Sequence, residues 1–217
     1  MDASALLSRL ACPLIPVVVI DRLDDAVPLA EALLQGGISA LEITLRTPVA
    51  CEAISAMKSA LPDAVIGAGT VSSGEAYGAA VQAGADFVVS PGATDQLFKT
   101  AAAHAVPFLP GAVTGSEVLR AMEFGYAALK FFPAEAAGGT PALQALSGPF
   151  PNVNFMPTGG VTPDNVANYF QLENVCAVGG SWLTPRELLM GQQWEALYQL
   201  AADSVAQVTV MSRGAPE

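Results

Sequence analysis

Short apolar runs of strand length alternate with alanine-rich amphipathic stretches of helix length from one end of this chain to the other. Strands are predicted at 14–20, 40–45, 65–69, 87–90, 107–109, 127–131, 153–156 and 175–178. Helices are predicted at 24–35, 49–60, 74–83, 95–105, 116–124, 141–146, 163–170 and 194–208, with a short helix at 4–10 in front. Eight strand-then-helix units favour a closed parallel (β/α)8 barrel, the TIM barrel of α/β proteins, over an open doubly wound sheet.

No linker or low-complexity segment divides the chain, so we expect one barrel domain spanning residues 1–217, with a short polar tail at 211–217 that frays. The first strand is not followed by the G-x-G-x-x-G pattern of dinucleotide-binding proteins, which weakens that alternative. In barrels of this kind the reactive groups gather where strands end and the following loops begin. A functional site is therefore expected at those eight junctions.

The composition limits the classes of partner. Hydrophobic residues make up 52% and charged residues 13% of the chain, which argues against disorder, and no apolar stretch reaches the roughly 18 residues of a membrane helix. The formal net charge of −11 disfavours nucleic acid and anionic membranes as partners. A small anionic substrate remains compatible, because screening over about 8 Å lets a few local cations in a cleft outweigh the overall charge.

Cysteine and histidine usage points to a cytoplasmic protein without a metal. The three cysteines are dispersed with no C-x-x-C pair, which is typical of reduced thiols, and the start of the chain lacks the basic segment of a secretory signal. The only histidine, His104, lies in an alanine-rich stretch. One histidine and no Cys/His cluster make a zinc site improbable, and we expect no metal and no other cofactor.

Lys130 is one of only three lysines and lies in the apolar run Ala127-Ala128-Leu129-Lys130-Phe131-Phe132-Pro133. Burial in such a strand disfavours the ammonium and favours the free amine, which is a nucleophile toward carbonyl carbon. Schiff-base chemistry is therefore one interpretation. The other is a structural lysine whose stem lines the strand end while its head reaches water.

Two further junctions carry polar groups with two possible roles each. Glu42, Thr44 and Arg46 alternate and so share one face of the second strand, where the acid and the guanidinium are either a base with an anion clamp or an internal ion pair. Thr70, which ends the third strand, either hydrogen-bonds a substrate carboxylate or caps the next helix.

Glycines follow the last two strands. Gly159 and Gly160 come after the seventh, and Gly179, Gly180 and Ser181 after the eighth. Glycine lets backbone N–H groups approach an anion closely, and phosphate sites recur after these two strands in (β/α)8 barrels. The pattern therefore predicts a phosphate site here, with ligand-free tight turns as the alternative.

Together these segments resemble the bacterial 2-keto-3-deoxy-6-phosphogluconate (KDPG) aldolases, which also act as 4-hydroxy-2-oxoglutarate aldolases. The similarity runs in order along nearly the whole chain, through residues 37–48, 67–71, 87–92, 129–135, 156–161 and 178–183. One departure is Gly115, where the family often has proline. It precedes a predicted helix and should affect loop stiffness more than chemistry.

The resemblance implies a class I aldolase that yields pyruvate and glyceraldehyde 3-phosphate, as in the Entner–Doudoroff pathway. Lys130 would form the Schiff base with the 2-keto carbon of a phosphorylated 2-keto acid, and Glu42 would be the general acid and base, working through a water. Family members are commonly homotrimers. The implied binding residues are Arg46 and Thr70 for the pyruvyl carboxylate, Pro91, Phe132 and Thr158 for the pocket walls, and Gly159, Gly160, Gly180 and Ser181 for the phosphate.

Rival functions keep the same barrel. One is the same chemistry on the galactonate-derived epimer or on unphosphorylated 4-hydroxy-2-oxoglutarate. The glycines and Ser181 favour a phosphorylated substrate, but the sequence does not show its stereochemistry. Another is a phosphosugar isomerase or epimerase in which Glu42 is the base and Lys130 acts only through its charge. A third is a barrel that binds a phosphorylated metabolite without catalysis.

Overall fold

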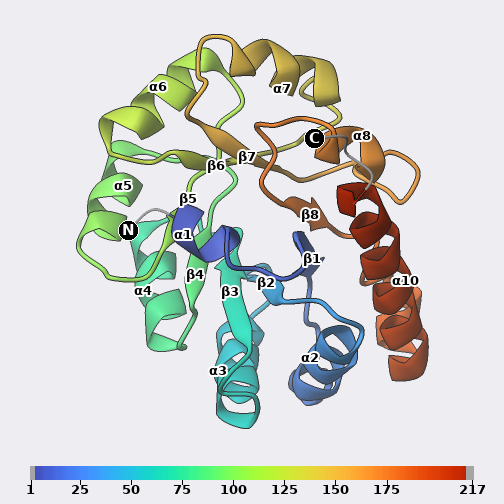
Figure 1. The fold of residues 1–217 in the computed structure, drawn as a ribbon. Helices are drawn as coiled ribbons and strands as arrows, with labels where there is room; N and C mark the ends of the chain where they lie inside the picture. The colour runs from blue at the N-terminus through green and yellow to red at the C-terminus, as the bar shows by residue number, and fades with distance from the viewer. Residues whose placement is uncertain (1–2, 214–217) are drawn as a thin grey trace.

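Eight parallel strands alternate with helices in the computed structural model, which describes residues 3–213, and the strands curl around a common axis (Figure 1). Each strand is short and buried, as expected of strands covered on one side by helices and filled on the other by side chains. The strands are β1 (Leu14–Val18), β2 (Ala40–Thr44), β3 (Val65–Gly69), β4 (Phe87–Val89), β5 (Phe108–Leu109), β6 (Ala128–Phe131), β7 (Asn154–Pro157) and β8 (Val178–Gly180).

Backbone pairing closes the strands into a ring. Six strands follow the order β5-β4-β3-β2-β1-β8, and β6 pairs with β7. Single bridges join these two sheets, from Gly111 to Lys130 on one side and from Thr158 to Gly179 on the other. At the first seam the Lys130 N–H donates to the Pro110 carbonyl at 2.9 Å. The predicted (β/α)8 barrel is confirmed, and Lys130 is part of its closure.

The helices surround the ring and take their starts from local capping. Ser73, Thr94 and Thr114 accept hydrogen bonds from backbone N–H groups in the first turns of α4, α5 and α6, and Thr114 forms a full capping box with Glu117. The helical elements are α1 (Ser4–Leu7), η1 (Leu23–Asp25), α2 (Ala26–Gln35), α3 (Ala50–Ala60), α4 (Gly74–Gln82), α5 (Asp95–Ala102), α6 (Gly115–Glu123), α7 (Gly139–Ser147), α8 (Val166–Phe170), α9 (Arg186–Met190) and α10 (Trp194–Arg213).

Two apolar clusters fill the fold. The larger lies between the strands and the surrounding helices. The smaller fills the inside of the barrel and includes Ala3 and Leu7 of the N-terminal segment, so that α1 covers one end of the ring (Figure 1). Its strand residues include Ala40, Phe87 and Ala128, which begin their strands. Helix α1 covers the end where strands begin, and the polar groups gather at the other end, where strands finish.

Most predicted elements are confirmed to within a few residues, but three predictions at the C-terminal side were wrong. Helix α9 was not predicted. Strand β8 begins at Val178 rather than at 175, because residues 175 and 176 pair with Phe155 and pairing with β1 starts only at Val178. The last helix does not end at 208. It continues through Arg213, three residues into the tail predicted at 211–217, and 214–217 lie outside the described residues.

Candidate active site

Lys130 and Glu42 form a buried pair inside the barrel. Lys130 lies on β6 with 5% of its surface exposed, and Glu42 lies on β2 with none. The lysine Nζ is 2.8 Å from Oε1 and 3.2 Å from Oε2 of the glutamate. The interpretation of Lys130 as a structural lysine whose head group reaches water is therefore wrong. The amine is enclosed against a carboxylate that can take or return a proton.

Glycines make the space that this pair occupies. A Cβ atom on Gly69 would lie 2.1 Å from Oε1 of Glu42, and one on Gly179 would lie 2.2 Å from Oγ1 of Thr158. Both glycines alternate along their strands with residues that face the helices. The inner wall is therefore bare backbone at these points, which leaves room for polar side chains. Neither glycine was singled out from the sequence for this role, although strand parity places both inside.

Thr44 and Arg46, the other two polar residues of this segment, have different contacts. The Thr44 hydroxyl donates to the Val18 carbonyl at 2.7 Å, so it ties β2 to β1. Arg46, beyond the strand end, is exposed and forms no ion pair within residues 3–213. The internal ion pair that we considered for Glu42 and Arg46 is absent there, because Glu42 faces Lys130.

Thr70 has a left-handed backbone, with φ of 59°, which is uncommon for a residue other than glycine. The cap of the following helix is Ser73, whose hydroxyl accepts from the Ala76 N–H. Thr70 therefore does not cap α4. Within the described residues its hydroxyl has no hydrogen-bond partner, and it stands directly after Gly69, beside the space held by Glu42.

Aromatic and proline side chains border the lysine. The Lys130 Nζ lies 5.7 Å from the centre of the Phe132 ring, within the range of a cation–π contact. Phe132 is 37% exposed and precedes a cis peptide bond to Pro133. Pro91 is exposed after β4, and its backbone lies against Gly111. Thr158 is buried at the end of β7.

The two glycine junctions differ in construction. Gly159 and Gly160 have φ values of 96° and 79°, so this turn requires glycine, and the Gly160 carbonyl accepts a hydrogen bond from Asn165 at 3.2 Å. Glu135 packs beneath Gly160 and accepts a hydrogen bond from the Tyr169 hydroxyl. Gly180, at the other junction, lies against the Trp182 ring, and Ser181 follows it at the surface.

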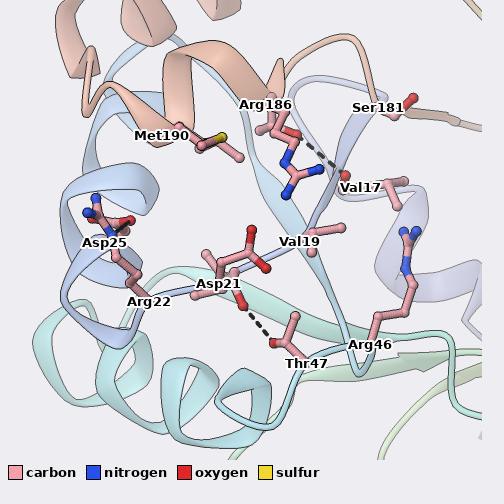
Figure 2. A pocket seen from close by; sticks show the side chains of 13 residues that line it. Val17, Val19, Asp21, Arg22, Asp25, Arg46, Thr47, Ser181, Arg186 and Met190 are labelled. Atoms are coloured by element: carbon pink, nitrogen blue, oxygen red, sulfur yellow. Dashed lines mark hydrogen bonds and ion pairs between the residues drawn. The ribbon is translucent and has the colours of Figure 1, made fainter.

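A cavity of about 610 Å³ opens at this end of the barrel, between the ends of β1, β2 and β8 and helix α9 (Figure 2). Arg46 and Ser181, two positions that the sequence analysis proposed as anion-binding, both line it. Lys130 and Glu42 are not part of its lining, but Val17 is, and Val17 is in register with Glu42. The full lining is Val17, Val19, Ile20, Asp21, Arg22, Asp25, Arg46, Thr47, Ser181, Thr184, Arg186, Leu189 and Met190.

Four charged residues of this lining were not singled out from the sequence: Asp21, Arg22, Asp25 and Arg186. Arg22 and Asp25 form a two-point ion pair, with both nitrogen–oxygen distances 2.9 Å, and Gln192 donates to the same carboxylate at 2.8 Å. Burial by itself raises the pKa of Asp25, but the hydrogen bonds from Arg22 and Gln192 outweigh burial and leave that pKa lowered. Arg186 begins the helix that the sequence pattern did not reveal.

The described part of the chain offers neither a metal cluster nor a membrane-spanning helix. Residues 3–213 contain no group of three or more histidine, cysteine, aspartate or glutamate side chains that could hold a metal ion. None of the helices in that range is both long enough and apolar enough to cross a membrane.

Comparison with known proteins decides the family. The family model of KDPG and KHG aldolases matches residues 8–200. The chain belongs to this aldolase family. The KHG/KDPG aldolase of Escherichia coli strain K12 is 45% identical over 193 residues, covering 89% of this chain and 91% of the relative.

Two solved structures of aldolases are similar over almost their whole length. A KDPG aldolase from Legionella pneumophila, with pyruvate captured as a covalent carbinolamine, has a TM-score of 0.91 at 44% identity and covers 94% of this chain and 98% of its own. The enzyme of Zymomonas mobilis ZM4 with 3-phosphoglycerate has a TM-score of 0.88 at 41% identity, covering 95% and 97%. Both support the aldolase barrel assigned to this chain.

Proposed function

We propose that this aldolase cleaves 2-dehydro-3-deoxy-6-phosphogluconate to pyruvate and glyceraldehyde 3-phosphate through a Schiff base on Lys130. The observation that carries the proposal is the enclosed contact between the Lys130 amine and the Glu42 carboxylate, 2.8 Å apart. A nucleophilic amine with an adjacent base is the minimum that imine formation needs. The carbinolamine of pyruvate in the Legionella relative supports the same first step.

The reaction would begin with transfer of the ammonium proton from Lys130 to Glu42. The free Nζ attacks C2 of the substrate, and the carbinolamine loses its hydroxyl as water once Glu42 returns a proton. The protonated imine then accepts the electron pair of the C3–C4 bond while the C4 hydroxyl loses its proton to the carboxylate, directly or through a water. Glyceraldehyde 3-phosphate leaves, C3 of the enamine takes a proton, and water releases pyruvate from Lys130.

We propose the following binding roles for the residues around this pair. Arg46 and the unpartnered Thr70 hydroxyl would hold the carboxylate at C1. Thr158 would line the pocket beside Lys130. Phe132 and Pro91 would form its walls, where ring and proline surfaces reduce access of water to the imine. Gly159, Gly160, Gly180 and Ser181 would donate to the phosphate.

The same site would also cleave 4-hydroxy-2-oxoglutarate. This substrate has the same reacting groups at C1 to C4, and its cleavage yields glyoxylate in place of glyceraldehyde 3-phosphate. The relatives named for both substrates support this second activity. We further propose a homotrimer in the cytoplasm that serves the Entner–Doudoroff pathway. Gel filtration with light scattering checks the trimer.

Borohydride trapping tests the proposal. Wild-type protein incubated with pyruvate and borohydride should carry one reduced pyruvyl adduct per chain, and peptide mapping should locate it on Lys130. Lys130→Arg should carry none, whereas the control Lys99→Arg, on the surface helix α5, should be labelled like the wild type. An isomerase that uses Lys130 only for its charge predicts no adduct, and an adduct at another lysine also rejects the mechanism. A panel of the gluconate and galactonate phosphates then identifies the preferred epimer.

A further inference from the structure

The phosphate-binding residues proposed above contain no cation. Gly159, Gly160 and Gly180 offer backbone N–H groups, and Ser181 offers a hydroxyl. The chain as a whole carries a formal charge of −11, so the protein at large gives a phosphate dianion no favourable potential. Arg46 is assigned to the carboxylate at the other end of the substrate. A second local cation near Ser181 would therefore strengthen the binding of a phosphate dianion.

The cavity that Ser181 lines contains three arginines, and their surroundings differ. Arg22 is held by Asp25 in a two-point ion pair that uses two of its five N–H donors and balances its charge. Arg186 is exposed and has no ion pair or side-chain hydrogen bond within residues 3–213. Figure 2 shows its guanidinium extending from α9 into the cavity, while Arg46 extends into it from the opposite side.

The segment that carries Arg186 is fastened to the barrel on both sides of it. Before Arg186, the Thr184 hydroxyl donates to the Val17 carbonyl at 3.4 Å. After α9, the Gln192 side chain donates to Asp25 at 2.8 Å. Since Ser181 begins the same loop, its hydroxyl and the Arg186 guanidinium belong to one anchored segment. A fixed segment loses less entropy on binding an anion than a free loop does.

The charges of the lining favour this assignment. Arg22 and Asp25 cancel each other, which leaves Arg46 and Arg186 against the exposed carboxylate of Asp21, a net charge of one positive unit. Without Arg186 the lining would be neutral, and its remaining unpaired cation, Arg46, would be engaged by the carboxylate at the other end of the substrate. Arg186 therefore determines the sign of the potential at this end of the cavity.

We propose that Arg186 is a specificity-determining residue that binds the phosphate of the substrate's aldehyde half. The assignment rests on the proposed aldolase function and extends it. The planar guanidinium can donate two parallel hydrogen bonds to phosphate oxygens. It supplies the charge that the glycines and Ser181 lack, and makes the site prefer a phosphorylated aldehyde over a neutral one.

The aldol direction tests this, because pyruvate and the Schiff base stay the same while the acceptor changes. Arg186→Gln should raise the KM for glyceraldehyde 3-phosphate at least about tenfold, the loss expected for a charge-assisted hydrogen bond. It should leave kcat/KM for unphosphorylated glyceraldehyde within about twofold. Arg186→Lys should lie between the two, since it keeps the charge without the planar fork. An equal loss with both aldehydes, or no loss with either, overturns the proposal.

Two further variants control for charge alone. Arg9→Gln makes the same charge change on an exposed residue next to α1, at the opposite end of the barrel, and should leave both KM values unchanged. Asp21→Asn removes the opposing carboxylate, so it should lower the KM for glyceraldehyde 3-phosphate. A raised KM would mean that Asp21 orients Arg186 rather than repels the ligand, and would contradict the charge argument.

A binding readout separates this proposal from the aldolase assignment. Titration calorimetry with inorganic phosphate should give a weaker dissociation constant for Arg186→Gln than for wild type, whether or not the protein cleaves any 2-keto acid. If the wild type forms no pyruvyl adduct, yet Arg186→Gln binds phosphate more weakly than the wild type does, the aldolase proposal fails and the anion site stands. If the adduct forms and phosphate binding is unchanged, the Arg186 assignment fails alone.

Discussion

The Nζ of Lys130 lies 2.8 Å from Oε1 of Glu42, although 88 positions separate the two residues in the chain. The two residues come from β2 and β6, which are not neighbours in the barrel. The contact therefore crosses the interior rather than following a strand pair. Two ionisable groups are costly to bury unless they pair with each other, and this pairing supports the proton transfer that we propose for Lys130 and Glu42.

Glu42→Gln removes the acceptor but keeps the shape of the side chain. We expect turnover to fall by roughly 10²–10⁴-fold, the usual contribution of a positioned general base. Some imine formation with pyruvate should persist, although more slowly, because the Lys130 nitrogen remains while its adjacent base is lost. Steady-state cleavage rates and borohydride trapping on the same preparation measure the two effects. Turnover equal to the wild type would remove Glu42 from the mechanism.

Gly69→Ala tests whether the bare backbone of β3 sets the position of Glu42. The added methyl would lie 2.1 Å from Oε1, and Glu42 is fully buried, so the carboxylate must shift away from Lys130. We expect a loss of turnover on the order of a hundredfold from this displacement. Overpacking should also lower the free energy of unfolding by about 1–3 kcal/mol.

Gly78→Ala is the matched control, since nothing lies within 4 Å of the methyl group that alanine would add at this position of helix α4. Alanine favours a helix over glycine by about 1 kcal/mol, so this variant should melt slightly higher and keep full activity. If Gly69→Ala keeps wild-type turnover while its melting temperature falls, Gly69 matters for packing and not for the position of the base.

The sequence predicts this site well where alternation along a strand is the deciding rule. Glu42 and Lys130 could be placed inside the barrel because side chains alternate between the two faces of a strand, and near its reactive end because their strands lead into polar junctions. Their mutual distance could not be predicted. It depends on the inward volumes of Gly69 and Gly179 on other strands, and the pattern within one strand carries no information about those volumes.

Arg186 illustrates a different limit. Helix α9 has five residues, too few to show a repeat of 3.6, and it follows Pro185 without a polar capping side chain. A loop was therefore expected at 179–193, and the arginine at its centre had no predicted direction. The conformation of Thr70 could not be predicted either, because the neighbouring residues do not indicate a left-handed backbone at a non-glycine position.

Ser181→Ala should discriminate between substrates with and without a phosphate group. The hydroxyl lies at the edge of the cavity and would donate only to the phosphate, so its loss should raise the KM for the phosphorylated acid several-fold. The KM for 4-hydroxy-2-oxoglutarate, which is shorter and lacks the phosphate, should change less than twofold by the same reasoning. Parallel kinetics on both acids measure the ratio, and equal changes would contradict a phosphate contact.

Asp25→Asn should change how stability depends on pH. Burial raises the pKa of Asp25, but the hydrogen bonds from Arg22 and Gln192 outweigh it, so the folded pKa lies below the unfolded value of about 3.9. A lowered folded pKa stabilises the fold above the unfolded value, and that stabilisation disappears as the pH falls through the folded pKa. The contribution is therefore present at neutral pH and lost below about pH 4.

Urea unfolding of wild type and Asp25→Asn at pH 7 and near pH 3 measures this difference. At pH 7 the variant should be less stable by roughly 1 kcal/mol, a modest value because half of the Arg22 side chain is exposed and screened. The gap should shrink as the pH falls. Asp24→Asn is the control, since Asp24 is exposed and forms no hydrogen bond through its side chain within residues 3–213. A gap that is constant with pH would show that Asp25 acts through packing rather than through its charge.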